Sequence, residues 1–221
     1  MSWFLKVFNS SVGCKLLMAL SGLIMVLFLV GHLAGNLLVF VGPDAIDTYA
    51  KTLRDYIAVL WVARLGLIGA VVLHIYCGIR LSYLNKQARP EAYYQKDPAD
   101  ATLASRSLLL SGLVILSFII YHLAHLTFRL THPSFEALGP YEVYKMLILS
   151  FQSPWVSSFY IVSLSLLMLH LSHGIWSLMQ SLGLNHSRYN ILLKALGPLL
   201  SIGLMSGFLS IPLAIWFGFI Q

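Results

Sequence analysis

Four histidines stand out because each lies in a long apolar stretch, where an ionisable side chain is expected to have a function. They are His32, His74, His122 and His170. The sequence Ser-Gly-Leu, beginning at Ser21 and at Ser111, precedes His32 and His122 by the same eleven positions. His74 and His170 each follow a leucine and precede a Gly-Ile pair by four positions. Imidazole nitrogens are common metal ligands, so four histidines in two repeated contexts indicate two bis-histidine metal sites.

Haem iron is the metal that suits such a pair. Two imidazoles on opposite faces of a porphyrin leave the iron no open position, so the haem carries electrons and does not activate oxygen. Zinc or copper is the alternative, but zinc requires sulfur, carboxylate or a third histidine, and only His125 lies close to His122. Cys14 and Cys77 form no C-x-x-C-H motif, which excludes covalently attached haem, and their separate apolar segments suggest no disulfide. We therefore predict two haem b groups.

The composition places these histidines in a membrane. Of the 221 residues, 58% are hydrophobic and 10% charged, whereas a soluble domain is about a quarter charged. A membrane-spanning helix needs roughly 20 apolar residues, and five stretches qualify without the alternation of strands. They cover about 14–41, 58–84, 107–131, 156–181 and 192–219. The predicted fold is an all-α membrane protein with a single domain, 1–221, in contact with lipid.

Basic residues predict the orientation, because cytoplasmic loops carry an excess of Lys and Arg. Nine lie at the N-terminus or near the second and fourth connections, and five lie on the opposite side. The nine are Lys6, Lys15, Arg80, Lys86, Arg89, Lys96, Arg106, Arg188 and Lys194. We expect a cytoplasmic N-terminus and an external C-terminus. The first apolar stretch is too long for a signal peptide and lacks a cleavage site, so we expect it to remain as a helix.

Depth in the membrane pairs the histidines. His32 and His122 lie 17 and 16 residues beyond Lys15 and Arg106, roughly 25 Å from the cytoplasmic side at about 1.5 Å per residue. His74 and His170 lie roughly 9–16 Å from that side. His32 and His122 are termed the outer pair, and His74 and His170 the inner pair. If the first four helices form an up-down four-helix bundle around the two haems, each pair meets across its centre.

Small residues and further histidines lie close to these four. Gly78 and Gly174 follow the inner pair by one turn, and Gly22 and Gly112 lie near its level. Such glycines either make room for a porphyrin or allow close helix packing, and the sequence leaves both open. His125 and His173 compete as ligands, but the repeats favour the four named above. His125 and His173 are expected to hydrogen-bond propionates, a quinone or carbonyl groups, and His132 and His186 to be solvated.

Polar residues near the two levels are candidates for contacts with ligands. Haem propionates need cationic or hydroxyl partners, for which the candidates are Lys15, Ser21, Arg106 and Ser177. A quinone pocket needs an apolar slot with a few polar groups. The outer side offers Asp44, Asp47, Tyr49 and His125 for this purpose. The connections 42–57 and 132–155 on that side are expected to form short amphipathic segments.

On these residues the chain resembles the di-haem cytochrome b subunit of succinate:quinone oxidoreductases, the b558 family, in which a single chain carries five helices. The resemblance spans all five apolar stretches. It rests on Gly31-His32, Leu73-His74, Ser111-Gly112 with Tyr121-His122, Phe159-Tyr160-Ile161-Val162 before His170, and Gly174-Ile175-Trp176-Ser177.

The resemblance implies a role in the respiratory chain and the tricarboxylic acid cycle, in a bacterial inner (cytoplasmic) membrane. A flavoprotein subunit would oxidise succinate, or reduce fumarate, on the cytoplasmic side, so this chain would hold no succinate site. An iron–sulfur subunit would pass electrons to the proximal haem of the inner pair. The distal haem of the outer pair would exchange electrons with menaquinone. Some members carry a glutamate two residues before the fourth-helix histidine, as part of a proton path; Met168 stands there, which favours succinate dehydrogenase over fumarate reductase.

Two other classes share part of this pattern. A di-haem b subunit of a hydrogenase or formate dehydrogenase would use the same histidines with another partner. A haem-free anchor or transporter would use them as hydrogen-bonding groups between helices. Nothing in the chain resembles a nucleotide fingerprint, a phosphate loop or an iron–sulfur cysteine cluster, so we expect no oxidation of a soluble substrate and no nucleic-acid binding.

Overall fold

Long helices carry all four histidines. The structure, a computed structural model, describes residues 8, 10–88 and 108–221. Five helices in this part are long and apolar enough to cross a membrane, and the described residues contain no strand. They are α2 (Ser11–Asn36) with the 3-10 turn η1 (Leu37–Phe40), α4 (Ile57–Gln87), α6 (Leu108–His122) with the π-helical turn η3 (Leu123–Thr127), α8 (Pro154–Ser181) and α9 (Asn190–Trp216). The prediction of an all-α chain with five candidate spans is confirmed.

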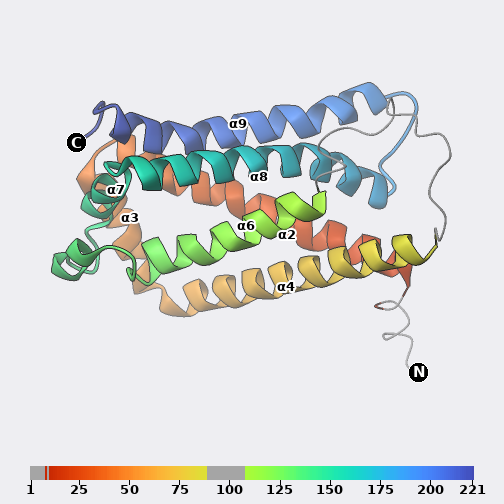
Figure 1. The fold of residues 1–221 in the computed structure, drawn as a ribbon, viewed down its shortest axis with the longest axis horizontal. Coiled ribbons are helices and arrows are strands. Elements are labelled where there is room, and N and C mark those ends of the chain that lie inside the picture. The colour runs from red at the N-terminus through yellow and green to blue at the C-terminus, as the bar shows by residue number, and fades with distance from the viewer. Residues whose placement is uncertain (1–7, 9, 89–107) are drawn as a thin grey trace.

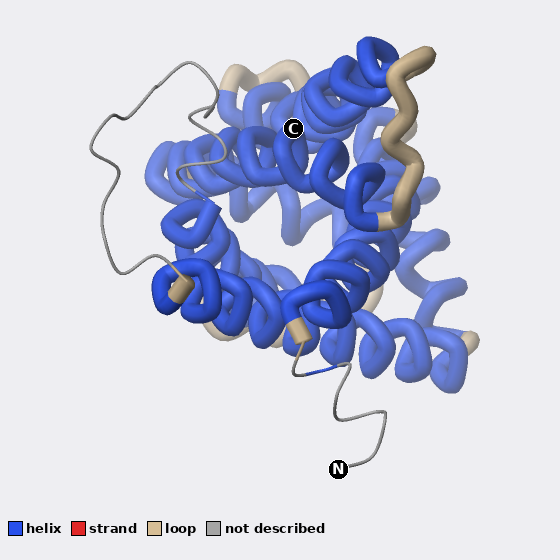
Figure 2. The backbone as a smooth tube through the Cα atoms, turned by 90° about the vertical axis from the view of Figure 1, so that its right-hand side faces the viewer, coloured by secondary structure: helices blue, strands red, loops and turns tan. Residues whose placement is uncertain are grey.

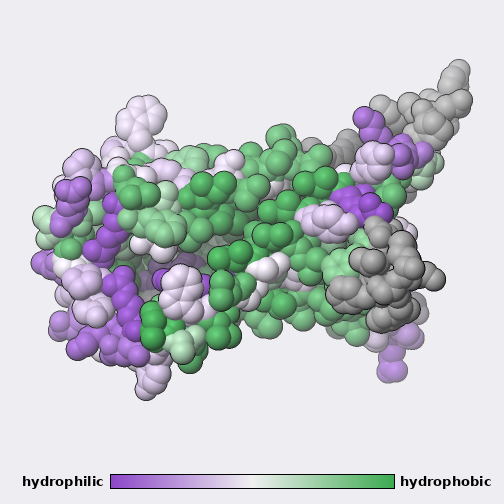
Figure 3. Space-filling view, turned by 90° about the horizontal axis from the view of Figure 1, so that it is seen from below, coloured by the Kyte–Doolittle hydropathy of each residue, from purple (hydrophilic) through white to green (hydrophobic). Residues whose placement is uncertain are grey.

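The surface of these helices suits a lipid environment. Figure 3 shows apolar residues across the middle of one face and polar residues gathered towards its two ends. Val62, Leu110 and Leu199 are all more than half exposed. An apolar surface of this extent is unusual for a protein in water, whereas helices that satisfy their own backbone hydrogen bonds are stable in hydrocarbon.

The helices pack so that α2 contacts both α4 and α8, α6 contacts α8, and α9 runs along α8. Viewed along the long axis of the molecule, the long helices surround its centre (Figure 2). The short helices α3 (Pro43–Asp55) and α7 (Val143–Phe151) gather with the C-terminus at one end, and the N-terminal side lies at the other (Figure 1). With the 3-10 turn η4 (Pro133–Ala137), they occupy the connections where short segments were predicted. This end is termed the α3–α7 end.

Local signals determine where the helices begin and end. Ser10 caps α2, because its hydroxyl accepts a hydrogen bond from the Gly13 N–H at 2.9 Å. The third span ends at Thr127 rather than at the predicted residue 131. The Phe128 N–H closes the π-helical turn on the Leu123 carbonyl at 2.8 Å, and Arg129 then takes a φ of 56°. This left-handed conformation turns the chain away from the helix axis.

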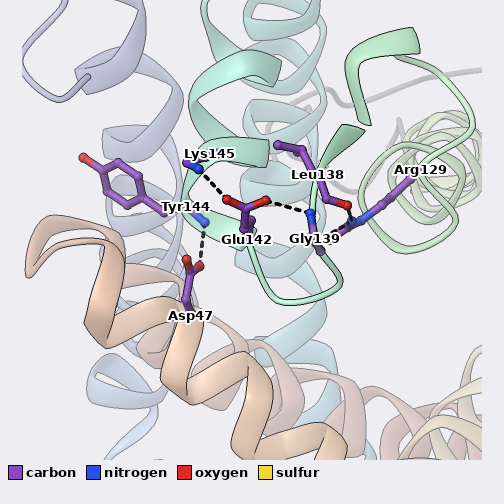
Figure 4. A network of polar contacts seen from close by, with 7 residues as sticks. All are labelled: Asp47, Arg129, Leu138, Gly139, Glu142, Tyr144 and Lys145. Carbon is purple, nitrogen blue, oxygen red and sulfur yellow. Dashed lines mark hydrogen bonds and ion pairs between the residues drawn. The ribbon is translucent and has the colours of Figure 1, made fainter. Parts of the chain in front are cut away.

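Polar contacts hold the α3–α7 end together (Figure 4). Asp47 of α3 accepts a hydrogen bond from the Tyr144 N–H at the start of α7, at 2.9 Å. The Arg129 guanidinium donates to the carbonyls of Leu138 and Gly139, at 3.4 and 3.0 Å. Burial lowers the pKa of Arg129, and the nearby positive charge of Arg54 lowers it further. The turn that leads into α7 is thus bonded to the end of the third span and to α3.

Glu142 makes the stability of this turn depend on pH. The Lys145 ammonium, with which it forms an ion pair, and the Gly139 N–H at 2.7 Å hold the pKa of Glu142 below its ordinary value. A lowered carboxyl pKa contributes stability above the unfolded value of about 4.3, and this is lost as the pH falls through the folded value. We therefore expect Glu142→Gln to reduce the hydrogen-exchange protection of the Gly139 amide near neutral pH, with the difference disappearing once the pH falls below the lowered pKa of Glu142.

The same ion pair raises the pKa of Lys145. The contribution of Lys145 to stability is therefore complete below its unfolded pKa of about 10.4 and is lost as the pH rises through its folded pKa. Glu136→Gln, in the same connection, is the control and should leave Gly139 protected. Equal protection in Glu142→Gln and the wild-type protein near neutral pH would contradict the assignment.

A glycine allows α9 to approach α8 closely. A Cβ built on Gly197 would overlap the carbonyl oxygen of Ser172 and lie 3.4 Å from its carbonyl carbon. We expect Gly197→Ala to lower the free energy of unfolding by about 1–3 kcal/mol, because the added methyl forces the backbones apart. Thermal unfolding in detergent measures this. Gly203→Ala is the control, because a Cβ there would meet no protein atom within 4 Å. Equal unfolding temperatures for the two variants would show that the close approach of α9 to α8 at Gly197 is not needed for stability.

Candidate bis-histidine centres

The structure places the predicted ligand histidines beside one another in two pairs. The ring centroids of His32 and His122 are 5.9 Å apart, with the ring planes at 90°. Those of His74 and His170 are 6.4 Å apart, with the planes at 60°. A metal ion bonded to one nitrogen of each of two imidazoles at about 2 Å holds the centroids roughly 6 Å apart. The spacing of both pairs is therefore compatible with one metal ion bonded to both rings.

Hydrogen bonds select the ring nitrogen of His74 that is free to bind a metal. Its Nδ1 lies 3.2 Å from the Met18 carbonyl, which can only accept, and 3.3 Å from the Ser21 hydroxyl. That hydroxyl donates its own proton to the Leu17 carbonyl at 2.8 Å. Nδ1 of a neutral His74 must therefore carry the hydrogen, because both of its partners act as acceptors. The lone pair then lies on Nε2, the arrangement typical of a metal-binding histidine.

His170 has a serine beside its ring through the second copy of the repeat. Its Nδ1 lies 3.3 Å from the Ser111 hydroxyl, which donates to the Leu108 carbonyl at 3.2 Å. The glycine that follows each serine lies against the same ring. A Cβ on Gly22 would be 3.5 Å from Cε1 of His74, and one on Gly112 would be 3.9 Å from Cε1 of His170. Each Ser-Gly pair thus serves the inner pair, while the histidine eleven positions later belongs to the outer pair.

Other groups orient the outer pair. The His32 ring stacks on Phe28, with centroids 5.1 Å apart and planes at 15°. The Asn36 amide nitrogen lies 3.3 Å from Nδ1 of His32 and donates to the His32 carbonyl at 2.7 Å. The Asn36 amide thus presents a donor to Nδ1 of His32, the reverse of the arrangement at His74, so Nε2 of His32 is free for a metal ion only if this amide donates to the His32 carbonyl alone. Nδ1 of His122 lies 3.3 Å from the Tyr160 hydroxyl.

Glycines beside the histidines face open space. A Cβ on Gly78 or Gly174, one turn beyond His74 and His170, would meet no protein atom within 4 Å, and the same holds for Gly31 beside His32. The glycines next to the histidines are therefore not needed for close helix packing. The spacing of the imidazoles at both pairs, the unprotonated Nε2 of His74 and the glycines beside the rings are compatible with a haem bonded to both histidines of a pair.

The remaining predicted site residues are the candidates for propionate contacts and the candidates for a quinone site. Lys15 is exposed and Ser177 is half-buried, while Ser21 is buried against His74. Arg106 lies outside the described residues. At the α3–α7 end, Asp47 is bonded to α7. The Tyr49 ring packs against Gly35 of α2, and Asp44 lies in the first turn of α3.

The other histidines occupy different surroundings. His125 is 1% exposed and hydrogen-bonds the Tyr160 hydroxyl at 3.0 Å. His173 is half-buried on α8, and His186 is exposed. His132, expected to be solvated, is half-buried and stacks on Phe135, with centroids 5.0 Å apart.

The sequence interpretation gave no role to Tyr160, although the structure joins it to two histidines. The spacing of Tyr160 from His170 in the sequence could have indicated such a role. Tyr160 precedes His170 by ten residues on one helix, which at about 1.5 Å per residue places it roughly 15 Å nearer the α3–α7 end. That is the level of the outer pair.

No protein-family model, curated protein or solved structure matches this chain.

Proposed function

We propose that the chain is the membrane-anchoring cytochrome b subunit of succinate dehydrogenase and holds two b haems, one in each histidine pair. The observation that supports this most strongly is the spacing of the ring centroids, 5.9 Å in the outer pair and 6.4 Å in the inner pair. When bound, a bis-histidine haem supplies a one-electron carrier without an open position for oxygen. The chain would thereby link an iron–sulfur subunit, served by a flavoprotein subunit, to menaquinone.

The residues have distinct tasks under this proposal. His74 binds through Nε2, because the Met18 carbonyl and the Ser21 hydroxyl keep its hydrogen on Nδ1. His170, beside the Ser111 hydroxyl, binds in the same way. His32 and His122 bind at the other level. The apolar spans around them exclude water, which keeps the sites at low polarity.

The proposed orientation follows from the basic residues, which favour a cytoplasmic N-terminus in a bacterial cytoplasmic membrane. The inner pair then lies towards the side on which the iron–sulfur and flavoprotein subunits dock. The α3–α7 end, opposite the N-terminal side (Figure 1), faces outwards, with the outer pair nearer to it. Menaquinone would react on that side.

Haem content and the choice of reductant test the proposal. The chain, purified from haem-replete cells, should contain two haems b per polypeptide, and in native membranes succinate should reduce them. Reduction by hydrogen or formate, with none by succinate, would assign the chain to another dehydrogenase. Purified, folded protein that contains no haem would overturn the proposal.

A further inference from the structure

Tyr160 lies between two histidines of the same helical region. Its phenol oxygen is 3.3 Å from Nδ1 of His122 and 3.0 Å from Nδ1 of His125. The side chain is 4% exposed. Its ring meets the rings of Phe118 and Phe151 edge-on, with centroids 5.1 and 4.9 Å apart. Aromatic packing therefore fixes the hydroxyl in place independently of the histidines.

A phenol has one proton, so it can donate to only one of the two imidazoles and must accept from the other. The two histidines therefore cannot have the same role. The one that donates to Tyr160 carries its hydrogen on Nδ1 and has a free Nε2. The one that accepts from Tyr160 carries its hydrogen on Nε2 and has no nitrogen left for a metal ion.

The surroundings of the two rings indicate which histidine donates to Tyr160 and which accepts from it. The π-helical turn Leu123–Thr127 begins directly after His122, and such turns are frequent at functional sites because they change the direction of side chains. The His125 ring stacks on Phe135 of η4, with centroids 5.6 Å apart and planes at 22°. The His122 ring lies beside His32.

We propose that Tyr160 is a positioning residue that makes His122, and not His125, the ligand of the outer pair; this rests on the proposed haem-binding function. His122 donates from Nδ1 to the phenol oxygen, and the phenol donates to Nδ1 of His125. The hydrogen bond from Nδ1 makes His122 a more basic ligand, which favours ferric over ferrous iron. Tyr160 thus orients the ligand and lowers the midpoint potential of the outer haem.

Tyr160→Phe tests this, because it keeps the ring that packs against Phe118 and Phe151 and removes only the hydroxyl. We expect the outer haem to bind about 10–100-fold more weakly, the usual effect of losing such a partner. Its midpoint potential should rise and its low-spin electron paramagnetic resonance signal should shift. The inner haem should keep its potential and signal, which also shows that the variant is folded.

Three further variants make the test specific. Tyr121→Phe removes a neighbouring hydroxyl that has no described bond to His122 or His125, and should leave both haems unchanged. His125→Gln retains a hydrogen-bond acceptor for the phenol and should keep an outer haem of nearly wild-type potential. His125→Leu removes that acceptor and should change the outer haem alone.

Each outcome supports or overturns the inference. An outer haem with unchanged potential and signal in Tyr160→Phe would overturn it, as would loss of the outer haem in His125→Gln. If Tyr160→Phe lost both haems through misfolding, the comparison of His125→Gln with His125→Leu would decide, since equal behaviour overturns the inference. A wild-type protein without haem would contradict the proposed function and this inference together, whereas two haems with an unchanged Tyr160→Phe variant would contradict the inference alone.

Discussion

Replacing His74 or His170 with alanine is expected to remove the same haem, and replacing His32 or His122 to remove the other. The imidazoles of each pair come from different helices and lie 6.4 and 5.9 Å apart, respectively, so either partner is needed to complete the site. Each variant should fall from two haems to one per polypeptide. Haem quantification and the spectrum of the remaining haem measure this.

The spectra make the experiment a test of pairing as well as of binding. Variants within one pair should leave identical residual spectra, and variants from different pairs should leave different ones. His186→Ala, in an exposed connection, is the control and should retain both haems. A shared residual spectrum for His74→Ala and His32→Ala would show that the pairing is wrong.

Loss of the serine hydroxyls should weaken the inner haem specifically. Ser21 and Ser111 lie 3.3 Å from Nδ1 of His74 and His170, where under the proposed function each accepts a hydrogen bond from the imidazole. Ser21→Ala and Ser111→Ala should each lower the affinity for the inner haem by about 10–100-fold. The rate at which apomyoglobin captures haem from the purified variants reports this loss.

A matched serine is available on α6. Ser117 is exposed, and its hydroxyl donates to the Leu113 carbonyl of its own helix, so Ser117→Ala should release haem at the wild-type rate. Ser21→Thr keeps the hydroxyl and should restore slow release. Faster release from the outer pair in Ser21→Ala would show that the serine serves a different site.

Much of the fold could be predicted because membrane helices are constrained by length and polarity. A stretch of roughly 20 apolar residues has few alternatives to a spanning helix. The depth estimate for the histidines depends only on the rise per residue and the basic helix ends. This is why both the five spans and the proximity of His32 to His122 and of His74 to His170 could be anticipated.

Contacts between levels were harder to anticipate. The interval of eleven residues between Ser21 and His32 corresponds to roughly 16 Å of helix, close to the expected separation of the two pairs. The serine therefore meets His74 on a neighbouring helix, not the histidine of its own motif. Ser21 could be predicted to lie near the inner pair, but its role as a hydrogen-bond acceptor depends on the Leu17 and Met18 carbonyls, which only the folded helix positions.

Local backbone geometry was not predictable from the apolar pattern. The π-helical turn after His122 and the left-handed Arg129 shorten the third span, although Phe128 and Leu130 would suit a longer one. Hydrophobicity reports where a helix is stable in lipid, and not where a turn of different pitch begins. The environment of His125 depends on that turn and on Phe135, which comes from a separate connection.

The distribution of ligands between the two helical hairpins has a consequence for biosynthesis. The outer pair takes one histidine from α2 and one from α6, and the inner pair takes one from α4 and one from α8. A nascent chain that has inserted only its first hairpin therefore contains half of each site and neither one complete. Under the proposed function, the outer site lacks its second histidine until α6 has been made, and the inner site until α8 has been made. Ribosome-bound chains arrested before α8 should therefore leave the inner site empty.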